Sequence, residues 1–71
     1  MNIEFIRENE DLIRTQVIRL HNLITYEGVA EYAGFDEKRG RYIISRWVRK
    51  QRKIDDEKLM KIYELVSKMK G

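Results

Sequence analysis

The side chains best suited to chemistry in this sequence are basic, and they are concentrated in one segment. Residues 38–54 carry eight lysines and arginines and no aspartate or glutamate. Residues 1–37 carry three basic side chains against eight acidic ones, and residues 55–71 carry four of each sign. A surface that is merely solvated usually intersperses the two signs, whereas this segregation produces a concentrated positive field. The pattern therefore predicts that residues 38–54 bind a polyanion.

Ten side chains of this segment are candidates for contact with such a partner. Arginine binds guanine O6 and N7 bidentately, while serine, tyrosine and lysine mainly meet phosphates. On duplex DNA we expect base contacts from residues 38–45 and phosphate contacts from residues 49–53. Arg41, Arg46 and Arg49 are the arginines that we most expect to touch DNA. The full set of candidates is Lys38, Arg39, Arg41, Tyr42, Ser45, Arg46, Arg49, Lys50, Arg52 and Lys53.

No catalytic constellation accompanies these basic residues. His21 is the only histidine, there is no cysteine, and Ser45 has no base beside it in the sequence. Acidic residues cluster at 8–11 and 55–57, but both clusters lie at expected helix starts, where capping and the helix dipole account for them. A phosphate-binding glycine loop is also missing from the sequence. We expect a protein that is not an enzyme and that holds neither a metal nor a cofactor.

The length and composition predict one small all-α domain over residues 1–71. A chain of 71 residues buries only about 60% of its unfolded surface, but a hydrophobic content of 42% suffices for a compact core. The frequent residues favour helix, and proline is absent. No apolar run approaches the roughly 20 residues that cross a bilayer, and no signal segment begins the chain. We therefore expect a soluble, cytoplasmic protein with no membrane contact.

The first expected helix covers residues 10–23, after an N-cap at Asn9. Its buried stripe is predicted at helical spacing, with Leu12 and Ile18 widening it. An apolar cluster precedes this helix, within residues 1–8. It could form a helical turn, an extended N-terminal arm or a self-association surface, and the sequence alone leaves the three open. The stripe comprises Ile13, Val17, Leu20 and Ile24, and the cluster comprises Ile3, Phe5 and Ile6.

A second, short helix is predicted over residues 26–33. Thr25 suits its N-cap, and Gly34 suits the left-handed position that ends it. Ala30 and Ala33 are small and would let another helix approach closely.

The expected fourth helix covers residues 56–70, with a cap at Asp55. Its buried stripe is Leu59, Ile62, Val66 and Met69, broadened by Met60, Tyr63 and Leu65.

The third helix, over residues 38–51, carries the basic segment. Asp36 is its candidate N-cap, and Gly40 weakens its first turn by about 1 kcal/mol relative to alanine. One face is predicted to be apolar and the opposite face basic and hydroxylated. Trp47 belongs to the apolar face, so we expect it in the core and not as a platform for bases. The other residues of that face are Ile44, Val48 and Gln51.

Together, these elements resemble the helix-turn-helix of the phage-repressor and Cro type. The resemblance rests on Ala30, Gly34 and Phe35, on the later run Ile44-Ser45-Arg46-Trp47, and on the basic residues 49–53 that lead into a capped amphipathic helix. It covers about residues 10–69. About four residues more than usual separate Gly34 from Ile44, so either the turn is longer or the recognition helix begins a turn early.

This resemblance implies a small four-helix DNA-binding domain that acts as a transcriptional regulator. It further implies a homodimer on a palindromic operator, in the cytoplasm of a bacterium or of a phage-infected host. The N-terminal cluster or the fourth helix would have to supply the dimer contact. Two alternatives stay open: a module or phage-type inhibitor whose basic face binds an acidic protein partner, and a DNA-architectural or excision factor.

Overall fold

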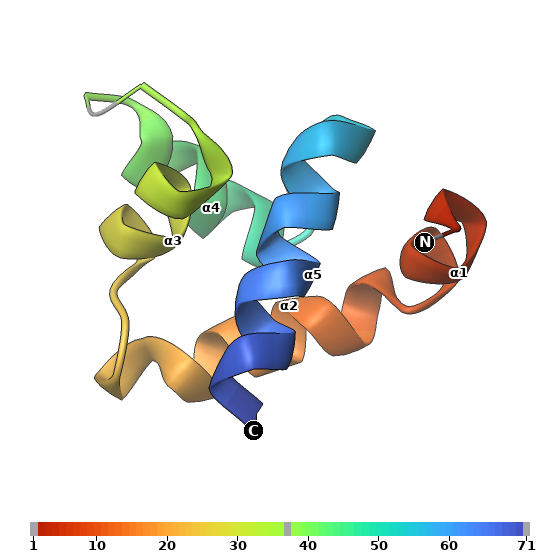
Figure 1. Ribbon diagram of the computed structural model, residues 1–71. Coiled ribbons are helices and arrows are strands. Elements are labelled where there is room, and N and C mark those ends of the chain that lie inside the picture. The colour runs from red at the N-terminus through yellow and green to blue at the C-terminus, as the bar shows by residue number, and fades with distance from the viewer. Residues whose placement is uncertain (1, 37, 71) are drawn as a thin grey trace.

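The computed structural model describes residues 2–36 and 38–70, and among them it contains α-helices and no strand (Figure 1). The predicted all-α class is confirmed, and all four expected helices are present. One further helix precedes them. In chain order the elements are α1 (Ile3–Glu8), α2 (Glu10–Arg19), the 3₁₀ turn η1 (Leu20–Asn22), α3 (Tyr26–Ala33), α4 (Gly40–Val48) and α5 (Asp56–Lys70).

The apolar cluster near the start of the chain forms α1 and is not an extended arm. Asn2 caps this helix, because its side-chain oxygen accepts a hydrogen bond from the Glu4 amide at 2.9 Å. Ile6 is fully buried, and α1 packs against α5 and α2. Phe5 remains half exposed. Residues 3–8 therefore contribute to the core of the domain.

The helix α2 is shorter than predicted and buries a narrower stripe. It ends at Arg19, where the chain tightens into η1. Ile13 and Val17 are buried, but Leu12 and Ile18 are 52% and 50% exposed. Because α4 and α5 pack against the side of α2 that carries the buried pair, these flanking residues stay in solvent. The prediction that Leu12 and Ile18 widen the core stripe is wrong.

Of the four predicted N-caps, those at Thr25 and Asp55 are confirmed, and those at Asn9 and Asp36 are not. The Thr25 hydroxyl accepts the Gly28 amide at 3.1 Å at the start of α3, and the Asp55 carboxylate accepts the Lys58 amide at 2.9 Å at the start of α5. Both helices have the predicted bounds. Asn9 instead donates its side-chain N–H to a carbonyl oxygen of α1 at 2.8 Å and makes no side-chain cap for α2. Its amide group is engaged by the end of the preceding helix.

The buried face of α5 matches the predicted stripe except at one position. Leu59 and Ile62 are fully buried, and Val66 and Leu65 are nearly so. Met60 is 38% exposed, so it does not broaden the core as expected. It lies on the outer side of α5, where no other helix of the described chain covers it.

At its start, α4 is shorter than the predicted helix. The carbonyl oxygen of Asp36 accepts the Gly40 amide at 2.7 Å, and its carboxylate accepts the Lys38 amide at 3.1 Å. Asp36 therefore stabilises a separate turn and is not the N-cap of α4. The helix begins at Gly40, after Arg39, which makes no side-chain cap.

At its other end, α4 stops at Val48 because the chain reverses direction two residues later. Lys50 has a φ of 64°, in the left-handed region. Its amide donates to the Trp47 carbonyl oxygen at 3.0 Å, and the Gln51 amide donates to the Arg46 carbonyl oxygen at 2.9 Å. This pair of bonds is the Schellman closure of a helix end. Gln51, predicted on the buried face, is consequently exposed.

A single cluster of buried side chains joins the helices, and it includes Trp47 as predicted. Trp47 and Ile44 are fully buried and attach α4 to the core. α3 packs against α4 and α5, and α2 packs against the same two helices (Figure 1). Within the described residues, no helix is long and apolar enough to span a membrane.

Candidate nucleic-acid interface

The basic segment is presented by a closely packed pair of helices, α3 and α4, joined by residues 34–39. Gly34 ends α3 with a φ of 90°, and the Phe35 amide donates to the Ala30 carbonyl oxygen at 2.9 Å. Gly40 is buried at the start of α4, where a Cβ would lie 2.6 Å from the Cβ of Ala30 and 3.1 Å from that of Phe35. The sequence predicted only that Gly40 weakens the helix. Its absent side chain in fact permits the close approach of α3 and α4.

The extra residues between Gly34 and Ile44 lie in the turn, because α4 does not begin before Gly40. Of the two alternatives for this insertion, the longer turn is therefore correct. Lys38 and Arg39 precede α4 and lie exposed on the turn. These two residues are consequently not part of the helix in which the sequence placed them.

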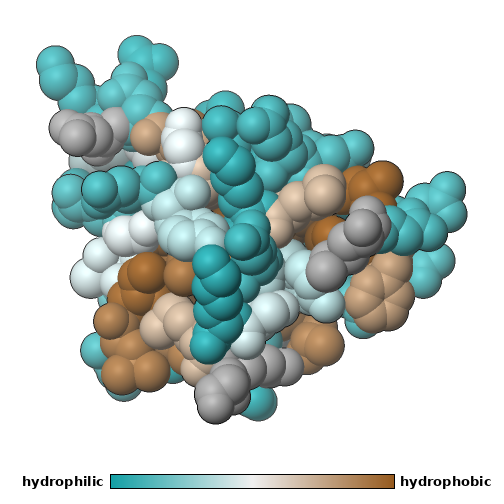
Figure 2. Space-filling model, viewed as in Figure 1, coloured by the Kyte–Doolittle hydropathy of each residue, from teal (hydrophilic) through white to brown (hydrophobic). Residues whose placement is uncertain are grey.

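Nine of the ten candidate side chains are exposed, and one is half buried. The half-buried one is Ser45, whose hydroxyl is less accessible than predicted. We call the exposed set the basic surface. It comprises Lys38, Arg39, Arg41, Tyr42, Arg46, Arg49, Lys50, Arg52 and Lys53. In Figure 2, hydrophilic side chains project at the upper left, over α4 and the turn before it.

Four residues of the basic surface surround one hollow of about 270 Å³, although they come from three segments of the chain. Arg39 contributes from the turn, Tyr42 and Arg46 from α4, and Arg52 from the loop after α4. Three guanidinium groups and a phenol around one exposed hollow offer the charge and the donors that bind phosphate oxygens. The fold thus brings together residues that are 13 positions apart in the sequence.

Arg41 lies at the edge of the basic surface, beside acidic residues. Its Nη2 donates to the Tyr42 hydroxyl at 3.2 Å, and its guanidinium lies 5.0 Å from the centre of the Tyr42 ring. A second hollow of about 200 Å³ places Arg41 with the carboxylates of Glu27, Glu31 and Asp36. Tyr42 is 57% exposed, so its ring lies on the surface and not in the core.

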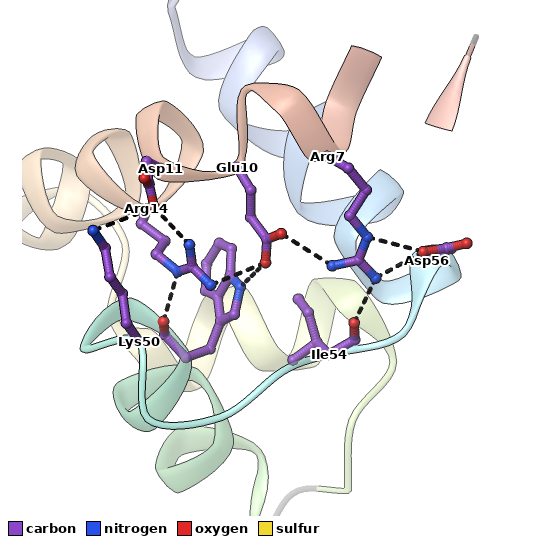
Figure 3. Close-up of polar contacts among 8 residues, drawn as sticks. Arg7, Glu10, Asp11, Arg14, Lys50, Ile54 and Asp56 are labelled. Atoms are coloured by element: carbon purple, nitrogen blue, oxygen red, sulfur yellow. Dashed lines mark hydrogen bonds and ion pairs between the residues drawn. The ribbon is translucent and has the colours of Figure 1, made fainter. Parts of the chain in front are cut away.

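A polar network fastens the end of α4 to α2 (Figure 3). The Trp47 indole N–H donates to Glu10 Oε2 at 2.8 Å, and Arg14 Nη2 donates to the same oxygen at 3.1 Å. Arg14 Nε donates to the Trp47 carbonyl oxygen at 2.8 Å. That carbonyl belongs to the last turn of α4, where acceptors otherwise lack helical partners. The network therefore caps α4 and orients the loop that follows it.

Arg7 fastens the far end of the same loop. Its guanidinium donates to the Ile54 carbonyl oxygen at 2.7 Å, to Asp56 Oδ1 at 2.7 and 3.0 Å, and to Glu10 Oε1 at 3.1 Å (Figure 3). The hydrogen bond with Asp56 is the main cause that raises the pKa of Arg7 above its usual value, and Glu10 adds to the effect. Residues 49–53 are held between these two anchors.

The sequence did not indicate the role of Glu10. The sequence pattern explained the acidic residues at 8–11 only by helix capping and the helix dipole. In the structure, Glu10 accepts hydrogen bonds from Arg7, Arg14 and Trp47. Nothing in the local sequence signals a bond between residues 37 positions apart. The neighbouring Asp11 pairs with Lys50 at 3.5 Å, but both side chains are about two-thirds exposed, so this pair leaves Lys50 accessible.

No group of three or more histidine, aspartate or glutamate side chains in the described part of the chain is arranged to hold a metal ion.

In comparisons with known proteins, no family model matches this chain, and no significant match was found among curated proteins or solved structures. The geometry of the basic surface is therefore the basis for assigning a function.

Proposed function

We propose that this protein binds double-stranded DNA through the basic surface. The observation that carries the proposal is the hollow lined by Arg39, Tyr42, Arg46 and Arg52. Guanidinium groups from three segments converge there on an exposed face, next to a helix whose opposite side is anchored in the core. This supports recognition of a phosphate backbone, which supplies most of the affinity of DNA-binding proteins.

The dimensions of α4 also favour a duplex as the partner. A helix with its side chains is about 10–12 Å across, and the major groove of B-DNA is about 12 Å wide. With α4 in the groove, Arg41, Tyr42 and Arg46 extend from its exposed side, while residues 49–53 lie near the flanking backbone. We therefore assign base contacts to Arg46 and Arg41, and phosphate contacts to Arg39, Arg52 and Lys53.

We further propose a regulator that recognises a particular DNA sequence and catalyses no reaction. The support is the pair of helices α3 and α4 joined by a turn, in which the small residues Ala30 and Gly40 let the exposed helix pack closely against α3. Such rigidity favours reading of base edges, because a donor misplaced by about 1 Å loses its hydrogen bond. A regulator of this kind would act in the cytoplasm of a bacterium or of an infected host.

Selection of bound sequences from a pool of random duplexes tests the proposal directly. We expect the pool to converge on one sequence, and we expect R46A to relax the preference at particular base pairs at a cost of about 1–3 kcal/mol. R52A should weaken the binding of selected and random duplexes alike. If the pool does not converge although random duplex binds in a salt-dependent manner, the protein is an architectural factor. If no duplex binds at low salt, the basic surface serves an acidic protein partner instead.

A further inference from the structure

The outer side of α5 forms a second surface, separate from the basic one. Seven residues, all from α5, line a shallow groove of about 690 Å³, and Met60 and Tyr63 are among them. An adjoining hollow of about 310 Å³ extends from Tyr63 to Phe5 and Leu12, which are 51% and 52% exposed. An apolar strip therefore continues from α5 onto α1 and α2, and no other part of the described chain covers it.

The charges beside this strip alternate in sign along one side of α5. They are Glu57, Lys61, Glu64 and Lys68, whose spacings of four, three and four residues place them on one stripe of a helix. In Figure 2, α5 runs down the front of the view, and a band of hydrophilic side chains follows it between paler surfaces. This face has no net formal charge. Its two carboxylates would repel phosphates, so it is unsuited to DNA.

The order of these charges makes the face complementary to itself. Glu57 and Lys68 lie at equal distances on either side of the point between residues 62 and 63, and so do Lys61 and Glu64. When a second α5 lies antiparallel across a two-fold axis at this point, each glutamate meets a lysine of the other copy. In a parallel pair related by a two-fold axis along the helices, the two charged stripes would lie on opposite sides of the contact and would not meet. A two-fold axis requires such self-complementarity.

Three of the four charged side chains, Glu57, Glu64 and Lys68, are exposed, and Lys61 is half-buried. Lys68 pairs with Glu64 of its own chain at 3.5 Å and donates to the Tyr32 hydroxyl at 3.1 Å. Both side chains are nevertheless more than half exposed, at 64% and 58%. Exposed ion pairs are weak and exchange partners readily. The internal pair therefore holds the charges at the edge of the face without covering it.

We propose that a second copy of this chain occupies the α5 face, with the two α5 helices antiparallel and Met60 and Tyr63 between them. A helix of 15 residues is about 22 Å long, so the contact falls short of the roughly 800 Å² per partner of a standard interface. We therefore expect a dimer that dissociates in the micromolar range. The two faces share no residue, so the dimer presents two basic surfaces. This dimer rests on the charges and apolar residues of α5 and not on DNA binding.

Sedimentation equilibrium without DNA, at neutral pH and low salt, tests this interface. We expect a reversible dimer of the wild-type chain, which E64K and K61E should each weaken about tenfold because like charges then meet twice across the axis. An equimolar mixture of E64K and K61E should recover dimers close to wild-type strength, since every pair is again of opposite sign. Far-UV circular dichroism of each variant confirms that the fold is intact.

A matched pair of apolar variants tests the centre of the face. Met60→Lys should abolish the dimer, whereas Ile18→Lys, which alters an apolar residue of α2 that is even more exposed, should leave it unchanged. A wild-type chain that is monomeric at about 1 mM overturns the proposal and leaves the groove to a different partner. A dimer that neither E64K nor Met60→Lys weakens overturns it as well. Loss of DNA binding in variants of Arg39 or Arg46 has no bearing on either result.

Discussion

At the scale of single residues, Trp47 combines burial with two hydrogen-bonded contacts to α2. Its side chain is fully buried, its indole N–H bonds Glu10 and its carbonyl oxygen bonds Arg14. We expect Trp47→Ala to lower the free energy of unfolding by about 3–5 kcal/mol, because a large aromatic residue leaves a cavity. That loss approaches the whole stability of a small domain. Urea unfolding followed by circular dichroism measures it, and a cooperative transition near that of the parent would contradict the placement of Trp47.

Glu10 provides a second prediction, because three donors share its two oxygens. Glu10→Gln removes the charge and turns an N–H group toward one of these donors. We expect it to lower the free energy of unfolding by about 1.5–3 kcal/mol, the range of hydrogen bonds to charged groups. Glu8→Gln is the control: Glu8 is exposed, and its replacement should change stability by less than about 0.5 kcal/mol. Equal effects of the two substitutions would show that the network adds no stability.

Sequence patterns predicted most of the buried residues, because periodicity records which side of a helix faces the core. Ile13, Val17, Ile44 and Leu59 illustrate this. The partners of polar side chains that join distant segments could not be predicted in the same way. Arg7 meets Ile54 and Asp56 only because the fold brings distant segments together, and no local spacing encodes that contact.

At the scale of helices, the α3–α4 pair depends on the absence of a side chain at Gly40. Gly40→Ala would place a Cβ 2.6 Å from that of Ala30. We expect it to lower the free energy of unfolding by about 1–3 kcal/mol through overpacking, although alanine is the better helix former. In the Ala30→Gly background the same change should cost clearly less, because the clashing atom is gone. Additive effects in urea unfolding would contradict the close contact.

At the end of α4, in contrast to Gly40, a glycine is missing where the backbone would favour one. Lys50 occupies a left-handed position that costs most residues about 1–2 kcal/mol and that glycine adopts freely. Lys50→Gly should therefore raise the free energy of unfolding by about 1 kcal/mol. Lys53→Gly, at an exposed position without a positive φ, should not. If chemical denaturation shows no gain for Lys50→Gly, the Schellman closure at this position is in doubt.

Helix ends could be predicted where a capping residue marks them and not elsewhere. Thr25, Gly34 and Asp55 carry recognisable signals, and the ends they mark lie where the sequence placed them. The end of α4 has no glycine, so the pattern extended that helix to residue 51.

The distribution of charge correctly located the exposed basic residues, but it could not show that Arg39 and Arg52 line the same hollow.

At the scale of the whole molecule, the fold separates three kinds of surface. The core-facing sides of the helices meet in one apolar cluster, the basic surface covers α4 and its flanking segments, and the α5 face carries balanced charge. This separation follows from the order of charges along the chain, since residues 38–54 contain no acid. The proposed contacts with DNA and with a second copy therefore lie on different surfaces of the molecule.

The salt dependence of binding to a fluorescent DNA duplex shows whether the basic surface contacts DNA. For the wild-type chain we expect the logarithm of the affinity to fall linearly with the logarithm of salt concentration. R52A should flatten the slope by about one unit, R39A/R52A/K53A, which removes all three assigned phosphate contacts, should flatten it by about three units, and the control R19A, which removes a charge from α2, should leave it unchanged. If the triple variant binds with the affinity and slope of the wild-type chain, the basic surface is not where this protein meets DNA.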